Sequence, residues 1–315
     1  MTDTTGISRR KLLGIAGGAA AGFAGGVGVG RATASDEPVA SSPAGGPVPF
    51  FGDHQAGIGT AAQDRLHFAS FDLLPGATRA DLVDLLKVWT EAAATMATGE
   101  LIEGPAANQD LNAPPRDTGE AQGLDPAQLT ITIGFGPSLF EHEGKDRFDI
   151  ASRRPAALKR LPHFADDNLN PDSSDGDIAI QACSDDPQVA VHAVRNLARL
   201  AHGVAAVRFS QLGFGRTSAT TSAQVTPRNL LGFRDGTANI RSDDEAAMRK
   251  HVWVAPGDEK GARAWMAGGS YLVARRIRMH IETWDRDPLG DQETVIGRPR
   301  SPRGRISGRG GGPVS

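Results

Sequence analysis

Cysteine is almost absent from this sequence, since Cys183 is the only one in 315 residues. A lone cysteine excludes an intramolecular disulfide, so packing and hydrogen bonds must hold the fold together. Cys183 lies in an apolar, strand-like run, which favours a small buried side chain over a reactive thiol.

A strongly apolar run of membrane-spanning length is also lacking. Residues 12–29 are long enough to suggest a transmembrane anchor, but the run is rich in glycine and alanine, which disfavours a lipid-facing helix. The run follows Arg9-Arg10, and Ala32-Thr33-Ala34 offers the small residues that a signal peptidase recognises. We predict that residues 1–34 are a twin-arginine signal peptide without a stable membrane anchor. The protein would then pass through the twin-arginine export machinery to the periplasm, the cell envelope or the exterior.

Basic residues do not exceed acidic ones. Removal of the signal takes away four basic residues and Asp3, which leaves 30 basic and 36 acidic residues. This acidic balance argues against nucleic acid as a partner. Because the twin-arginine pathway moves proteins that are already folded, a cofactor loaded before export becomes a reasonable expectation.

Two further segments depart from globular composition. Residues 35–49 are rich in proline, glycine, serine and alanine, which is typical of a linker. In residues 297–315, 6 Gly, 5 Arg, 3 Pro and 3 Ser make up 17 of 19 positions. This composition predicts either a disordered basic tail or a segment translated out of frame.

The body of the chain alternates strand and helix patterns. Thr78 with Asp81, and Asp186 with Pro187, indicate the starts of two helices. Trp89 falls on the apolar face of the first helix and is expected in the core. Apolar or alternating runs predict four strands around these helices, over residues 66–73, 129–135, 177–183 and 204–209.

The resulting order is strand, helix, strand, strand, helix, strand, which is the ferredoxin-like split βαβ arrangement. We therefore predict an α+β fold in which residues 50–225 form a ferredoxin-like subdomain. Residues 226–296 would open a second such subdomain, with a strand over 270–277 and a helix-like stretch over about 280–291. On this prediction the second subdomain would be incomplete in this sequence.

The segment Leu231-Gly232-Phe233-Arg234-Asp235-Gly236-Thr237-Ala238-Asn239 stands out. Alone, Asp-Gly followed by Thr is an ordinary turn signal. Four other runs accompany it in order: FGDHQAGI at 51–58, IGFGPSLF at 133–140, QLGFGRT at 211–217 and GSYLVARRIR at 269–278. Together they resemble the dye-decolourising haem peroxidases, from about Pro49 to Gly297, and specifically the exported deferrochelatase/peroxidase subgroup of that family.

The resemblance implies two ferredoxin-like subdomains that hold haem b. Asp235 matches the family's distal aspartate, which moves a proton from one oxygen of hydrogen peroxide to the other. The resemblance also places Gly236, Thr237 and Ala238, together with Phe233 and Arg234, at the haem. Glycine beside the aspartate would let the backbone approach a porphyrin closely.

The family's axial histidine and distal arginine lie in segments that do not appear in this sequence. The eight histidines are His54, His67, His142, His163, His192, His202, His251 and His280, and none lies in a run that resembles the ligand segment. For His54 a structural hydrogen bond is the expected role. We therefore assign no metal ligand, and expect haem to bind weakly or not at all.

The resemblance implies a peroxidase that uses hydrogen peroxide to oxidise dyes or phenolic compounds. An alternative is release of iron from haem with the porphyrin left intact, and a third is a non-functional fragment. The expected partners are therefore hydrogen peroxide with an organic reductant, or haem itself. Members of the family often form homo-oligomers. Tyr271, Trp253, Trp265 and Trp284 are candidate electron relays, although core packing is the expected role of each.

Overall fold

A computed structural model describes residues 46–102, 112–165, 167–215, 226–236 and 238–301. The predicted signal peptide and most of the predicted linker lie outside this range. Among the described residues, no helix combines the length and the apolar character needed to cross a lipid bilayer.

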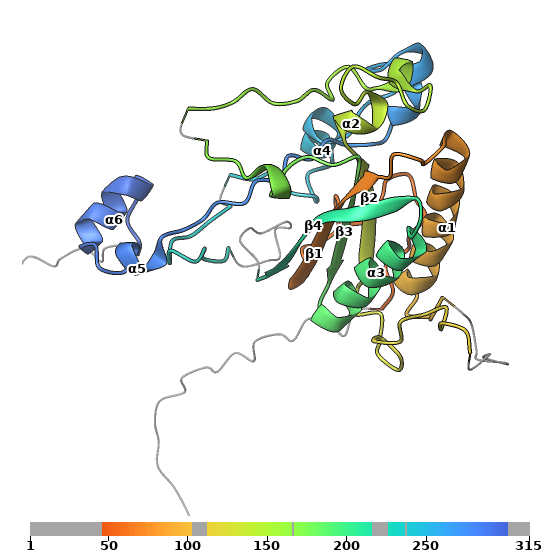
Figure 1. Cartoon of the computed structure of the whole chain (residues 1–315). Coiled ribbons are helices and arrows are strands. Elements are labelled where there is room, and N and C mark those ends of the chain that lie inside the picture. Colours follow the sequence, from red (N-terminus) through yellow and green to blue (C-terminus); the bar gives the residue numbers. More distant parts are fainter. Residues whose placement is uncertain (1–45, 103–111, 166, 216–225, 237, 302–315) are drawn as a thin grey trace, which may run out of the picture. The chain divides into compact units, whose positions relative to one another are not determined.

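The N-terminal half contains one four-stranded sheet with two helices (Figure 1). Its strands are β1 (Arg65–Leu73), β2 (Thr130–Phe135), β3 (Ile178–Ser184) and β4 (Ala205–Phe214), and its long helices are α1 (Arg79–Ala97) and α3 (Pro187–Leu200). The strand order is β2-β3-β1-β4 and every neighbouring pair is antiparallel. This is the ferredoxin-like arrangement that the sequence predicts, so the α+β prediction is confirmed.

Both helices begin where the sequence places their caps. The hydroxyl of Thr78 accepts the backbone N–H of Asp81, and the Asp81 carboxylate accepts the backbone N–H of Thr78 in return. The Asp186 carboxylate accepts the N–H groups of Gln188 and Val189, with Pro187 in the first turn. These bonds satisfy donors that have no partner within a helix, and so fix the first turn.

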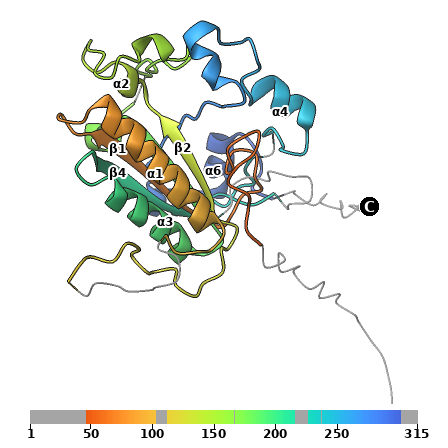
Figure 2. The ribbon, with the colours of Figure 1, turned by 90° about the vertical axis from the view of Figure 1, so that its right-hand side faces the viewer.

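The core lies between the sheet and these helices, which cover the same face of the sheet (Figure 2). Alternate strand residues point into it, as the register of β1 and β3 shows by pairing Ala69 with Ile180 and Phe71 with Ile178. Trp89 is fully buried, and its indole N–H donates to the Leu197 carbonyl at 2.8 Å. Its predicted core role is confirmed. Cys183 is largely covered, and burial raises the pKa of its thiol to about 11, which keeps it protonated at neutral pH.

Strand β4 is longer than the sequence pattern suggested. The prediction of a strand ending at residue 209 was too short, because β4 continues to Phe214 and pairs along all of β1, from Arg65 with Phe214 to Leu73 with Ala205. A bulge between Ser70 and Phe71 adjusts the register. Pairing with β1, which is far away in sequence, therefore extends β4 through residues 211–214 of the QLGFGRT run.

Short helices occupy the remaining segments. They are α2 (Pro137–Phe140), α4 (Glu245–His251), α5 (Ile281–Trp284), α6 (Leu289–Ile296) and the 3₁₀ helices η2 (Ala151–Arg153), η3 (Pro171–Ser173) and η4 (Gly261–Met266). The helix-like stretch predicted over 280–291 is two helices, because Pro288 has no N–H to continue α5. Gly297, with φ of 76°, ends α6 in the left-handed conformation.

The strand predicted over residues 270–277 is not formed, and that prediction was wrong. Residues 271–280 are extended and exposed, including Leu272 at 66% and Ile277 at 74%. A strand requires a neighbour that supplies N–H and C=O partners, and the described residues provide none for this segment. Ion pairing of Arg275 with Asp167 and a bond from Arg276 to Gln211 contribute to its position.

A buried polar cluster fastens residues 112–122 to α3. The Asp117 carboxylate and the His192 ring, both almost fully buried, lie 2.8 Å apart, and Asp117 also accepts the N–H groups of Ile102 and Gly119. Burial alone would raise the pKa of Asp117, but these hydrogen bonds outweigh it and lower the pKa below its usual value.

This lowered pKa predicts an acid sensitivity that Asp117→Asn should reduce. A carboxyl whose pKa is lower in the folded state stabilises the fold above its unfolded-state pKa, and that contribution is lost as the pH falls through the folded-state value. The wild-type free energy of unfolding should therefore decrease as the pH is lowered below about 4. The variant should be less stable than the wild type at pH 7, but its free energy of unfolding should decrease less steeply with falling pH. Urea unfolding between pH 3 and 7 measures both slopes. Equal slopes would contradict the assignment to Asp117.

Candidate functional site

Residues 226–236 form a compact loop around the Asn229 side chain. Asn229 N–H donates to the Phe233 carbonyl at 2.9 Å, and Asn229 Oδ1 accepts the N–H groups of Leu231 and Phe233. Gly232 has φ of 83°, a left-handed conformation that favours glycine. Asn229 was not among the site residues predicted from the sequence. Its position two residues before Leu231 is the pattern of an Asx turn, which could have indicated it.

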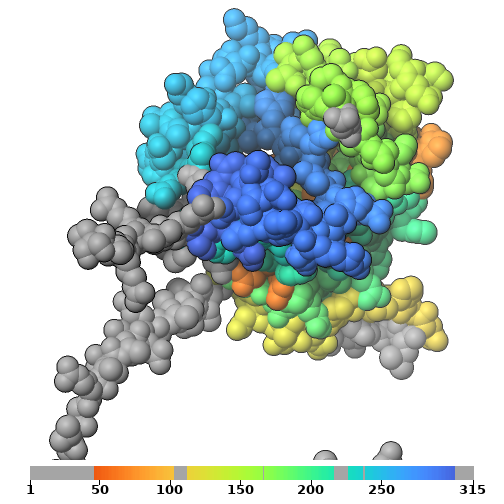
Figure 3. All heavy atoms as spheres, turned by 90° about the vertical axis from the view of Figure 1, so that its left-hand side faces the viewer, coloured from red at the N-terminus to blue at the C-terminus, as the bar shows by residue number. Residues whose placement is uncertain are grey.

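Phe233 anchors this loop to α5. Its side chain is fully buried and contacts the Trp284 ring edge to face, with the centroids 6.1 Å apart. The α5–α6 segment lies on the face seen in Figure 3, where it is dark blue. Phe233, predicted to line the haem, and Trp284, a candidate electron relay, therefore pack against each other and hold the loop in place.

Asp235 lies two residues after Phe233 and is partly buried. One of its carboxylate oxygens accepts the backbone N–H of Gly236 at 2.9 Å, and its own N–H donates to the Pro227 carbonyl at 3.1 Å. Gly236 has φ of 64°, so backbone conformation gives this position a second reason to be glycine. Arg234 and Ala238 are exposed on either side, and Thr237 lies outside the described residues.

Arginines from a distant segment reach the same loop. Arg298 Nη2 donates to the Arg234 carbonyl, and Arg228 Nη1 donates to the carbonyls of Gly232 and Arg300 at 2.8 and 2.7 Å. The composition of residues 297–315 suggested a segment that does not pack. Arg298 and Arg300 do contact the loop, and residues 302–315 lie outside the described range. No local pattern marks Arg298 and Arg300, because only the tertiary arrangement brings them to the loop.

The histidines have other positions. His54 Nδ1 lies 2.7 Å from the Gly268 carbonyl, and the ring stacks on Trp253 with centroids 3.7 Å apart, so its predicted structural hydrogen bond is confirmed. His192 pairs with Asp117, and His67 is in β1 where burial lowers its pKa. In the described part of the chain, no histidine forms a hydrogen bond or ring contact with residues 226–236, and no cluster of three or more His, Cys, Asp or Glu could hold a metal ion.

The other relay candidates also have packing contacts. The Trp265 indole N–H donates to the Arg153 carbonyl, and its ring packs against Phe140. The Tyr271 hydroxyl lies 3.3 Å from Glu259 Oε1, and burial together with that carboxylate raises the pKa of Tyr271.

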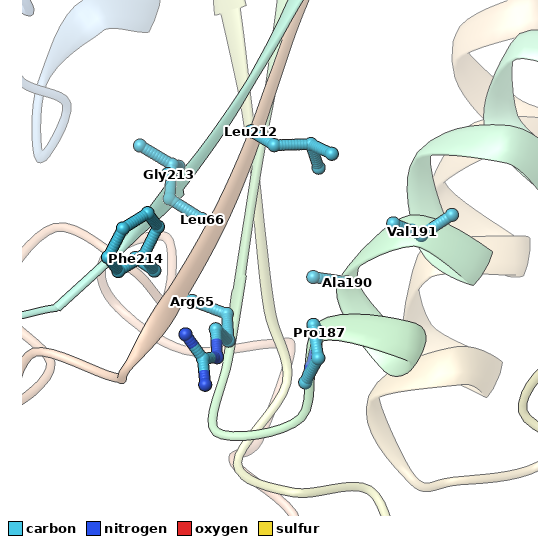
Figure 4. Close-up of a pocket in the computed structure, with 8 residues that line it drawn as sticks. All are labelled: Arg65, Leu66, Pro187, Ala190, Val191, Leu212, Gly213 and Phe214. Carbon is cyan, nitrogen blue, oxygen red and sulfur yellow. The ribbon is translucent and has the colours of Figure 1, made fainter.

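A cavity of about 210 Å³ lies elsewhere, between the ends of β1 and β4 and the first turns of α3 (Figure 4). Apart from the Arg65 guanidinium its lining is apolar: Leu66, Pro187, Ala190, Val191, Leu212, Gly213 and Phe214. Because it offers no group that can transfer a proton, it is not the candidate for the chemistry suggested by Asp235.

Known protein families match both halves of the chain. The Dyp-type peroxidase N-terminal model matches residues 55–215, and the Dyp-type peroxidase C-terminal model matches residues 226–309. Proteins called deferrochelatase are 35% identical over 255 residues in Yersinia pseudotuberculosis and 37% identical over 254 residues in Escherichia coli K12. These alignments cover 80% and 79% of this chain but only 56% and 57% of the relatives, so the chain spans little more than half of their length.

Solved structures give the same match. Ferric DtpA from Streptomyces lividans is 38% identical to this chain with a TM-score of 0.69. The match covers 85% of this chain and 66% of the DtpA chain. A DyP-type peroxidase from Cellulomonas bogoriensis is 36% identical with a TM-score of 0.66, and the match covers 82% of this chain and 66% of that peroxidase chain.

Proposed function

This chain belongs to the Dyp-type peroxidase family, and from that premise we propose that it is a haem-dependent peroxidase in which Asp235 moves the proton. The observation that supports the proposal most directly is the position of Asp235, partly buried in a loop fixed by Asn229 and by the packing of Phe233 on Trp284. Such a loop holds a carboxylate in one place without sealing it from a ligand.

Two features of the loop fit a haem: the glycine at position 236 and a group of arginines. Gly236 presents backbone without a side chain, and Arg228, Arg234, Arg298 and Arg300 provide cationic groups suited to carboxylates. Among the described residues, no histidine forms a hydrogen bond or ring contact with the loop. We therefore propose that these residues would hold haem at Gly236 and through the haem carboxylates, and that haem affinity is low because no histidine of the described residues contacts the loop.

Haem, when bound, supplies the iron at which the peroxide O–O bond breaks. Asp235 would accept a proton from one oxygen of hydrogen peroxide and donate it to the other, so that this second oxygen leaves as water. The hydrogen bond from Gly236 N–H orients the carboxylate for both transfers. Dyes and phenolic compounds are the proposed electron donors, and residues 1–34 the proposed export signal.

A second function is favoured by the name of the relatives, since the Yersinia and Escherichia proteins are called deferrochelatase. In that case haem is the substrate and iron is removed from it. The two functions leave different products, because a peroxidase consumes hydrogen peroxide and oxidises the donor, whereas iron removal yields free protoporphyrin.

A haem titration with product analysis tests both functions. We expect the purified protein to contain much less than one haem per chain and to bind added haem weakly, seen as a Soret band that saturates only with excess haem. Haem-saturated protein should oxidise a phenolic dye only when peroxide is present. Fluorescent protoporphyrin formed without peroxide would support iron release instead. If neither oxidised dye nor protoporphyrin is formed, the result would support a non-functional fragment. Near-stoichiometric haem on purification would contradict the low affinity.

A further inference from the structure

Four arginines lie at the loop that presents Asp235. Arg228 and Arg234 belong to the loop, and Arg298 and Arg300 arrive from the segment that follows α6. The side-chain hydrogen bonds of Arg228 and Arg298 go to backbone carbonyls, which are neutral. Among the residues that the structure describes, none of the four forms an ion pair with a carboxylate. The cluster therefore concentrates positive charge that its own bonds do not balance.

The arrangement is held in place before any ligand arrives. Arg300 N–H donates to Glu293 Oε1 at 3.0 Å, which ties this segment to α6. The Arg300 guanidinium lies over Gly232 so closely that a Cβ there would be 2.8 Å from Nη2. Any other residue at position 232 would displace it. Glycine at position 232 is therefore required both by the left-handed turn and by the close approach of Arg300.

One donor in the cluster has no partner. Arg298 Nε is buried and forms no hydrogen bond to the described residues, although Nη2 of the same guanidinium donates to the Arg234 carbonyl. A buried N–H without an acceptor is unfavourable, and an anion beside it would remove that penalty.

We propose that Arg298 and Arg300, with Arg228 and Arg234, form a binding site for the carboxylate groups of a porphyrin beside Asp235. This inference rests on the proposed haem function and extends it to residues outside the family motif. The planar guanidinium fork matches a carboxylate in a bidentate arrangement, and several arginines together suit a ligand with two carboxylates.

Metal-free protoporphyrin IX and its dimethyl ester separate this site from iron ligation. The diacid carries two carboxylates, the ester carries none, and neither contains iron. Binding is measured by porphyrin fluorescence anisotropy. The wild-type protein should bind the diacid at least tenfold more tightly than the ester. The R298Q/R300Q variant should lose most of that difference and leave ester binding unchanged.

Two further variants distinguish charge from structure. R298K/R300K keeps the charge and should retain part of the diacid affinity, whereas a purely structural role predicts the same loss as for glutamine. R263A removes an exposed arginine of η4, away from the loop in sequence, and should change nothing. Equal affinity of the wild type for diacid and ester would overturn the arginine site while leaving the haem function standing. Failure of both porphyrins to bind would overturn both proposals.

Discussion

Asp235→Asn should lower the rate of peroxide turnover by haem-saturated protein by about 10²–10⁴-fold, the contribution typical of a positioned proton-transfer group. Asparagine has nearly the same shape, and its side-chain oxygen can still accept the Gly236 N–H that Asp235 accepts at 2.9 Å. What it loses is the ability to take up a proton and release it. The fold should be unaffected, because Asp235 lies at a partly exposed loop position.

The measurement compares peroxide consumption and dye oxidation at equal haem occupancy, determined from the Soret band. Asp125→Asn is the matched control, since it makes the same chemical change at an exposed loop position. It should leave turnover within the error of the assay. Unchanged turnover in Asp235→Asn would show that another group moves the proton.

Trp89→Ala should have the largest effect on stability, a loss of about 3–5 kcal/mol in the free energy of unfolding. Trp89 is fully buried, its ring contacts Phe71 edge to face at 5.2 Å, and its indole N–H donates to the Leu197 carbonyl. Alanine leaves a cavity where α1, α3 and β1 meet, and the surrounding backbone can fill that cavity only in part.

Trp89→Phe separates packing from hydrogen bonding. It keeps an aromatic ring but removes the N–H, so it should cost about 1–3 kcal/mol, less than alanine. Val88→Ala lies next to it in the chain on the exposed side of α1, with 41% of Val88 accessible, and should change stability by less than about 0.5 kcal/mol. Urea unfolding followed by circular dichroism measures all three. A loss below about 1 kcal/mol for Trp89→Ala would contradict the assigned core role.

The sequence was informative where structure depends on neighbours along the chain. Thr78 with Asp81, and Asp186 with Pro187, mark helix starts because a cap bonds to N–H groups two or three residues away. The sequence was less informative where partners are distant. The end of β4 is set by β1, and residues 270–277 have a strand-like pattern yet no partner strand in the described residues.

The same division applies to the candidate site. The family, Asp235 and Gly236 could be identified from the amino-acid sequence, because the residues of the motif are adjacent in the chain. The burial of Phe233 against Trp284, the closing of the loop by Asn229 and the approach of Arg298 and Arg300 could be seen only in the folded structure. Arg228 and Arg300 are 72 residues apart, and nothing local specifies such a meeting. It depends on where α5 and α6 pack, which is a property of the folded chain.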